Sequence, residues 1–451
     1  MKVYACDRLR QGGEWLAPGF VSVDDSGTIL AVGSTPPEGS APEPVHGWVV
    51  PGMPNLHSHA FQRAMSGLTE HASGTGDSFW TWRETMYRFL ERLGPDEVEA
   101  IAAELYVEML EAGYTAVGEF HYLHHAPDGR DYDNPVELAE RIVAAARATG
   151  IRLTMLPVLY AASGFDGAPP ESAQRRFANS PAWLLDAVER LRKTPDLRVG
   201  IAPHSLRAAP PEELAECVTA IKRLDPSAPV HVHIAEQHAE VEACLAARGA
   251  RPVAWLCEHA PVDARWCLVH ATHVDDAEID AIVKSGATVG LCPTTEANLG
   301  DGTVPRRLPL QARFGIGSDS HVSIGVAEEL RLLEYGQRLA GEQRNLLASA
   351  TSPSVGSFLH AAALAGGAQA LAQPVGKAAP GLGADLVVLD PDHPVLLGRP
   401  AERTLDAYVF SSQGSPVRDV MVAGQWVVKD GRHRDRELVR KRYRQAVDRL
   451  R

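Results

Sequence analysis

The chain has 451 residues, 45% of them apolar, which is enough for one large domain and a smaller one beside it. Its formal net charge of −13 argues against a nucleic-acid or anionic-membrane partner. No apolar run reaches the roughly 18 residues of a membrane span, and the first residues do not resemble a signal peptide. The six cysteines form no Cys-x-x-Cys pair, so we expect reduced thiols and a cytoplasmic protein.

The two ends of the chain are predicted to form one small β-sandwich domain. Short alternating apolar segments separated by Gly and Asp turns occur near both ends, at 2–6, 19–23, 28–32, 381–390, 420–424 and 425–428. Two such pieces most simply pack together, so we expect residues 1–49 and 374–432 to make this domain. Residues 433–451 are charged with a helical period, which predicts a solvated C-terminal helix.

Between these ends, residues 50–373 alternate short apolar strands with longer helical stretches. The predicted strands are 47–50, 114–120, 152–159, 197–202, 229–235, 266–270, 287–292 and 314–317. Well-marked helices, several with Pro or Asp in the first turn, are predicted at 95–112, 135–148, 211–224 and 275–285. Eight strand–helix units predict an α/β fold of the (β/α)8 TIM-barrel type, in which the chemistry lies at the C-terminal ends of the strands. The long segment 64–93, with Trp80, Trp82 and Arg83, is predicted to form part of the rim.

Two histidines at a spacing of two follow the first of these strands. Alternate residues on a strand face the same way, so His57 and His59 can present ring nitrogens to one cation while Ser58 turns away. A lone His-x-His pair is a weak signal, because such histidines are about as often surface or core residues. The prediction of a metal site therefore depends on polar residues at the ends of other strands.

Three further strands carry such residues. His231 and His233 share one face of the fifth strand; His233 is nearer the C-terminal end, so we expect it to be a ligand and His231 to be structural inside the barrel. The sixth strand ends in His270, and Asp319 follows the eighth. Nitrogen and carboxylate ligands of this kind suit zinc, with a water in the open position. The sequence therefore predicts one metal site, made by His57, His59, His233 and Asp319.

These motifs resemble the amidohydrolase superfamily along nearly the whole chain. The similarity lies in the Pro-Gly-x-x-x-x-His-x-His start, the His-x-x-Glu of 233–236, His270 and Ser318-Asp319. More narrowly, residues 54–63, 119–122, 202–207 and 317–321 are similar to the formimidoylglutamate deiminases. This resemblance implies hydrolysis of N-formimino-L-glutamate to N-formyl-L-glutamate and ammonia in histidine degradation, and a homodimer. Two alternatives stay open: a deaminase of a nucleobase, nucleoside or triazine, and a non-catalytic protein of the same fold.

The catalytic roles follow from that chemistry. Relatives with two metals use a carboxylated lysine or an equivalent acid as a bridge, but none of the seven lysines here falls at a barrel strand end, so we expect one metal, most simply zinc. Asp319 is predicted to take the proton of the attacking water, and Glu236 to pass a proton to the departing nitrogen. His270 is predicted to hydrogen-bond the water or the tetrahedral centre. An alternative role for Glu236 is to fix a metal ligand.

A dicarboxylate substrate requires cations and donors at the mouth of the barrel, and guanidinium groups suit carboxylates by their bidentate geometry. Arg207 and His204 follow the fourth strand, and Arg83 lies in the rim segment, where an ordinary surface helix would explain it almost as well. The resemblance implies five substrate-binding residues: Gln62, Arg83, Tyr122, His204 and Arg207. We assign no role to the neighbouring histidines His121, His124 and His125.

Overall fold

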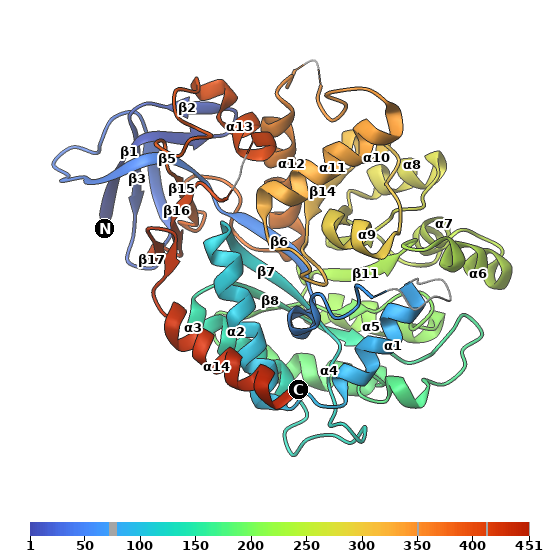
Figure 1. The fold of residues 1–451 in the computed structure, drawn as a ribbon. Helices are drawn as coiled ribbons and strands as arrows, with labels where there is room; N and C mark the ends of the chain where they lie inside the picture. The colour runs from blue at the N-terminus through green and yellow to red at the C-terminus, as the bar shows by residue number, and fades with distance from the viewer. Residues whose placement is uncertain (72–78, 350, 412–413, 451) are drawn as a thin grey trace.

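The structure is a computed structural model that describes residues 1–71, 79–349, 351–411 and 414–450, without the side chains of 79–81. A barrel surrounded by helices occupies the larger part of the molecule, and a sheet of strands from both chain ends lies beside it (Figure 1). None of the helices within those ranges has both the length and the apolar composition that crossing a bilayer requires.

The barrel is built from parallel strands in the order β10-β8-β7-β6-β14-β13-β12-β11, with β9 beside β8. Their bounds are β6 (Met53–Ser58), β7 (Tyr114–His121), β8 (Arg152–Leu159), β9 (Arg198–Val199), β10 (Ala202–Pro203), β11 (Val230–Ile234), β12 (Trp266–His270), β13 (Thr288–Leu291) and β14 (Arg313–Ile316). Ile201 joins the two ends of this order, because its N–H donates to Pro229 O (3.1 Å) and its carbonyl accepts from His231 N (3.0 Å). The predicted barrel is confirmed; its fourth strand consists of two short pieces, β9 and β10.

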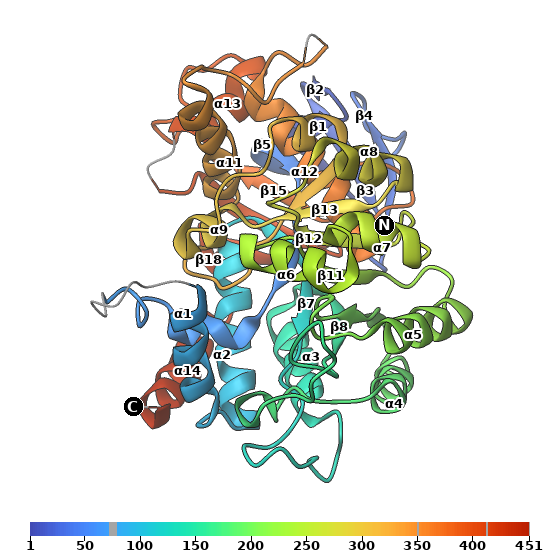
Figure 2. The same ribbon diagram turned by 90° about the vertical axis from the view of Figure 1, so that its right-hand side faces the viewer.

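Helices cover the outside of the barrel (Figures 1 and 2). They are α2 (Pro95–Glu111), α3 (Glu137–Thr149), α4 (Pro181–Leu191), α5 (Pro211–Leu224), α6 (His238–Arg248), α7 (Pro252–His259), α8 (Asp276–Ser285), α9 (Pro293–Leu299), α10 (Arg307–Gln311) and α11 (Val326–Gly341). The four helices named from the sequence are confirmed. The predicted rim segment, 64–93, begins in the last two residues of η1 (Ala60–Met65) and contains α1 (Phe79–Leu90), while 72–78 and the side chain of Trp80 lie outside the described residues.

One end of the barrel is plugged by the last turn of α12 (Val355–Leu371). His231 Nε2 lies 2.8 Å from Ala370 O, and Thr154 Oγ1 donates to Leu371 O (2.8 Å), both near the starts of their strands. His231 is therefore structural inside the barrel, as predicted. The helix comes so close that a Cβ on Gly366 would lie 1.9 Å from Phe314 O. The opposite end, where the strands finish, is left for chemistry.

Strands from both chain ends form one mixed sheet, which confirms that the two terminal pieces associate. The strands are β1 (Lys2–Gln11), β2 (Glu14–Leu16), β3 (Gly19–Val23), β4 (Ile29–Gly33), β5 (Glu43–Pro51), β15 (Leu386–Leu389), β16 (Val417–Val422), β17 (Gln425–Lys429) and β18 (Arg432–His433). The link between the halves is the antiparallel pair of β5 and β15. Two further short 3₁₀ helices are η2 (Ser172–Gln174), which precedes α4 of the barrel, and η3 (Ala401–Arg403), which leads into α13 (Thr404–Ser411).

Two expectations about the ends of the barrel were wrong. The apolar run 47–50 lies in β5 of the terminal sheet, and the first barrel strand is β6, which itself carries His57. The chain changes sheets at Gly52, where a Cβ would meet Thr115 at 2.2 Å. The C-terminal helix α14 (Arg436–Leu450) lies against α2 rather than free in solvent, because Arg436 and Arg440 both pair with the buried Glu104 (Figure 1).

Candidate active site

The two histidines of the His-x-His pair lie at the C-terminal end of β6. His57 is the penultimate residue of the strand and fully buried, and His59 follows the strand directly, with its ring centroid 4.6 Å from that of His57. His59 Nδ1 lies 3.0 Å from the carbonyl oxygen of Phe120. Because a carbonyl can only accept, Nδ1 carries the hydrogen, and the lone pair of Nε2 is left for a cation.

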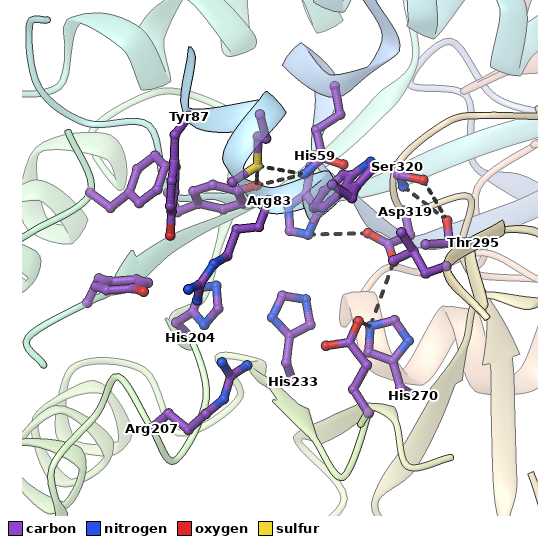
Figure 3. Close-up of a pocket in the computed structure, with 18 residues that line it drawn as sticks. His59, Arg83, Tyr87, His204, Arg207, His233, His270, Thr295, Asp319 and Ser320 are labelled. Carbon is purple, nitrogen blue, oxygen red and sulfur yellow. Dashed lines mark hydrogen bonds and ion pairs between the residues drawn. The ribbon is translucent and has the colours of Figure 1, made fainter. Parts of the chain in front are cut away.

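Four of the predicted residues converge on one point at this end of the barrel, and Figure 3 shows three of them, His59, His233 and Asp319. His57 Nε2 lies 3.0 Å from His233 Nε2 and 3.5 Å from Asp319 Oδ1. His59 Nε2 lies 3.3 Å from the same carboxylate oxygen. The structure thus brings together the four residues predicted as ligands. The donor atoms of His57, His59 and Asp319 are close enough to hold one metal ion, and His57 and His233 form a second such group with His270.

The charges of these groups suit a metal site. Burial lowers the pKa of His57 to about 3 and lowers the pKa values of His59 and His233 below their ordinary range, so all three imidazoles are neutral. Burial raises the pKa of Asp319, but the hydrogen bond from His57 and the nearby histidines outweigh burial and hold the pKa well below its usual range. Neutral imidazoles and an ionised carboxylate are the forms that coordinate metals.

The backbone is strained where these side chains leave their strands. Asp319 has a φ of 47° and His270 a φ of 70°, in the left-handed region that residues other than glycine rarely adopt. Ala235, directly before Glu236, has a φ of 52°. Such conformations cost of order 1–3 kcal/mol each and persist where the surrounding structure imposes them, typically at functional sites.

A buried acid that we did not assign from the sequence, Glu119 on β7, holds the His-x-His loop in place. Its carboxylate accepts from Ala60 N (2.7 Å), from Ser58 Oγ (2.7 Å) and from the Tyr106 hydroxyl (3.2 Å). Burial raises the pKa of Glu119 to about 7. Ser58 therefore turns away from the histidines, as predicted. The available signal was an acid within an otherwise apolar strand.

Glu236 and His270 lie next to the four convergent groups. His270 Nε2 is 3.6 Å from Glu236 Oε1 and 3.7 Å from Asp319 Oδ2. Burial raises the pKa of Glu236 to about 7. Burial lowers the pKa of His270, but Glu236, Glu296 and Asp319 outweigh it and raise this pKa to about 10. An acid that titrates near neutrality can both take up and release a proton within one turnover.

The cavity in front of these groups has an empty volume of about 620 Å³, counted to its open mouth. Arg83 from α1 and Arg207 from the loop after β10 both point into it near His204 (Figure 3). Gln62 Nε2 donates to the Tyr122 hydroxyl (2.7 Å), and Gln62 Oε1 is buried without a hydrogen-bond partner among the described residues. All five residues predicted to bind substrate therefore line one cavity.

Sequence reasoning missed part of this cavity. Its apolar wall is aromatic, and residues on three different segments supply it: Trp82, Tyr87, Tyr160 and Phe177. Thr295 and Ser320 line the side next to Asp319, and their hydroxyl oxygens are 3.0 Å apart. Trp82 was placed in the predicted rim segment, but the others are single aromatic or hydroxyl residues on α1, on α9 and on the segments after β8 and β14, and they give no periodic signal. Only the fold shows that they share a site.

The histidines left without a role lie outside this cavity. His124 Nε2 is 3.0 Å from Val158 O, and His125 Nε2 is 2.8 Å from Ala178 O. These bonds tie the loop after β7 to β8 and to the segment that follows it. His121 is buried on β7, and burial lowers its pKa to about 3. A structural role thus accounts for His124 and His125.

Comparison with known proteins gives the same family from several directions. The formimidoylglutamate deiminase of Pseudomonas aeruginosa is 53% identical over 413 residues, covering 90% of each chain. The 5-methylthioadenosine/S-adenosylhomocysteine deaminase of Natronomonas pharaonis is 29% identical over 93% of this chain and 92% of its own. The crystal structure of an amidohydrolase from Brucella melitensis matches with a TM-score of 0.93 and 44% identity over the whole of both chains. The profile of the Amidohydrolase family matches residues 48–427, and the chain belongs to that family.

Proposed function

We propose that this protein is a metal-dependent deiminase that hydrolyses N-formimino-L-glutamate to N-formyl-L-glutamate and ammonia, a step in histidine degradation. The observation that carries this proposal is the arrangement of the cavity: two arginines lie at one end, and the His and Asp cluster lies at the other. A dicarboxylate with an amidine at its far end matches both. The 53% identity to a protein named formimidoylglutamate deiminase supports the same substrate.

The expected metal is one zinc ion. Zinc bound tetrahedrally at about 2.0–2.1 Å has neighbouring ligand atoms about 3.3 Å apart. The 3.0 Å between the Nε2 atoms of His57 and His233, and the 3.3 and 3.5 Å from His59 Nε2 and His57 Nε2 to Asp319 Oδ1, agree with that spacing. No lysine is present at the barrel strand ends to bridge a second ion. When bound, such an ion lowers the pKa of its water towards neutrality and polarises the carbon that is attacked.

The residues around this ion would then move the protons. Asp319, ionised and buried, takes the proton from the attacking water. Glu236, whose pKa burial raises to about 7, passes a proton to the departing nitrogen, because ammonia leaves far more easily than an amide anion. His270, 3.6 and 3.7 Å from these two carboxylates, donates a hydrogen bond from Nε2 at the reacting centre.

Recognition of the substrate is assigned to the other end of the cavity. Arg83 and Arg207 bind the two carboxylates, and His204 stays neutral because burial, with the help of Arg207, holds its pKa well below the ordinary range. Gln62 and Tyr122, which are hydrogen-bonded to each other, contribute polar groups for the same carboxylates. We further propose a cytoplasmic homodimer in which residues 1–49 and 374–432 act as one domain, 50–373 as the barrel domain and 433–451 as a terminal helix.

The direct test is ammonia release from N-formimino-L-glutamate. The purified protein should release ammonia and leave N-formyl-L-glutamate. Activity should be lost on chelation and return with about one equivalent of zinc, measured by metal analysis. Guanine, cytosine, an adenosine derivative and a triazine serve as parallel substrates. Turnover of a heterocycle with none of formiminoglutamate would overturn the proposed substrate while leaving the metal site intact.

Arg207→Met is expected to raise KM for formiminoglutamate about 100-fold, because it removes a charge-assisted hydrogen bond worth about 2–3 kcal/mol in a buried setting. kcat should change less than fivefold, since the reacting carbon lies at the other end of the cavity. Steady-state kinetics measures both. Arg223→Met, at an exposed position of α5 and outside the cavity, is the matched control and should leave KM unchanged.

A further inference from the structure

His270 has a second neighbour that the proposed mechanism does not use. While Nε2 of the ring faces Glu236 and Asp319, the other nitrogen, Nδ1, lies 3.3 Å from Oε1 of Glu296. Within the part of the chain that the structure describes, no other hydrogen bond reaches Nδ1. The ring and the Glu296 carboxylate are both buried. The two nitrogens of one imidazole therefore face opposite ways, one toward the reacting centre and one toward Glu296.

The Glu296 carboxylate is itself held in place. It lies on α9, which begins two residues after β13 ends, and its Oε1 also accepts a hydrogen bond from Cys292 N (2.9 Å). One oxygen thus has two donors, and the carboxylate cannot turn without losing both. The acceptor that faces His270 is therefore fixed relative to the barrel strands.

The main chain alone does not fix the ring. His270 and Ala271 both have left-handed backbone, with φ values of 70° and 49°. His270 is the last residue of β12, so the regular strand does not continue past it. A buried imidazole can present either nitrogen to a given point, and the hydrogen bond made by one nitrogen decides which way the other points. At His270 that hydrogen bond is the one to Glu296.

We propose that Glu296 is a positioning residue: by accepting the Nδ1 hydrogen of His270, it keeps Nε2 directed between Glu236 and Asp319. The inference rests on the proposed function, because it assumes that His270 acts on the reacting centre. It adds a residue that the sequence motifs did not indicate. Glu296 is the fourth residue after the predicted strand 287–292, at the end of Pro-Thr-Thr-Glu, and so does not lie at the strand end itself.

A different use of the same atoms makes a competing prediction. His270, Cys292 and Glu296 can place one ligand atom each within 4.8 Å of one another, which is also the pattern of a metal site. If that site were real, the wild-type protein would bind two equivalents of metal and Glu296→Gln would lose one. A positioning role requires one equivalent in both.

A double-mutant cycle tests whether Glu296 acts through His270. Glu296→Ala is expected to lower kcat about 100-fold, the upper range for partners of catalytic-site histidines, with KM changed less than threefold. Glu296→Gln, which still offers an oxygen to Nδ1, should lower kcat only about tenfold. In a His270→Ala background, Glu296→Ala should cost less than about twofold, because the residue through which it acts is gone. Equal losses in both backgrounds would overturn the proposal.

Glu329→Gln is the matched control. Glu329 is a fully buried carboxylate on α11 that accepts from Thr294 N (2.9 Å) and Thr294 Oγ1 (2.6 Å), so it holds the start of the same helix α9 without touching His270. This variant should lower the melting temperature and leave kcat within about threefold. If it lowered kcat as much as Glu296→Gln, the position of α9 and not the hydrogen bond to His270 would be the cause.

Two measurements do not depend on turnover. Metal analysis should give one equivalent in wild type, Glu296→Ala and Glu296→Gln. Proton NMR should show a low-field imidazole N–H signal that disappears in both Glu296→Ala and His270→Ala, as a hydrogen bond to a carboxylate predicts; its survival in Glu296→Ala would overturn the proposal. The kinetic cycle is run on whichever substrate the wild type hydrolyses. Failure with formiminoglutamate thus counts against the proposed function, and an effect of Glu296→Ala that ignores His270 counts against Glu296.

Discussion

Asparagine in place of Asp319 is expected to lower kcat/KM by about 10⁴-fold, because the change removes both a metal ligand and the base for the attacking water. The amide is nearly the same size, so the fold should survive. The buried imidazoles of His57 and His59 would lose the charge that now lies 3.5 and 3.3 Å from them. Metal analysis and kinetics on the same sample separate loss of the ion from loss of the base.

Asp385→Asn is the control for this change. Asp385 is also a buried carboxylate, but it lies directly before β15 and away from the cavity, where it accepts from Arg152 Nε of β8 and from Ala423 N. Losing it should lower the free energy of unfolding while kcat of the metal-loaded enzyme stays the same. An Asp319→Asn variant that retained more than a tenth of wild-type activity would show that another group takes the proton.

Glu236→Gln is expected to lower kcat about 10³-fold with little change in KM, because general acid–base catalysis by a positioned side chain contributes roughly 10²–10⁴-fold. Metal content should stay at one equivalent, since Glu236 is not among the four convergent groups. The bend in the pH profile of kcat near pH 7, which follows from the raised pKa of Glu236, should vanish as well.

Glu240→Gln tests whether any nearby acid would do. Glu240 is also buried, lies four residues further on, and accepts a hydrogen bond from Glu236 N (3.0 Å). We expect less than a tenfold loss of kcat, because its carboxylate contacts the backbone of Glu236 and not the cavity. Loss of metal in Glu236→Gln would instead favour the alternative in which Glu236 fixes a ligand.

The metal residues could be predicted from the sequence because two simple periodicities point to them. Alternation along a strand places His57 with His59 and His231 with His233, and the barrel rule places strand ends on one side. These inferences need no knowledge of the loops. They also distinguished His231, which bonds the plug helix, from His233, which faces the other three groups.

The supporting residues could not be predicted in the same way. Glu119 accepts hydrogen bonds from Ala60 and Ser58, which flank His59, and Glu296 faces His270. Both contacts join residues far apart in the sequence, and they depend on how β7 and α9 pack against β6 and β12. The change of sheets at Gly52 was missed because an apolar run before a turn fits either sheet. The docking of α14 was missed because its partner, Glu104, is a buried acid on a helix that looks amphipathic.

The pairing of β5 with β15 has a consequence for how the protein folds during its synthesis. β5 runs directly into β6 and so holds the strand that carries His57, yet its partner β15 lies beyond the whole barrel in the chain. On the ribosome, the edge of β5 that later pairs with β15 therefore stays unpaired while the barrel is translated. A nascent chain stalled before Leu386 would have every barrel strand but an open sheet edge, and we expect it to depend on chaperones until the last segment emerges.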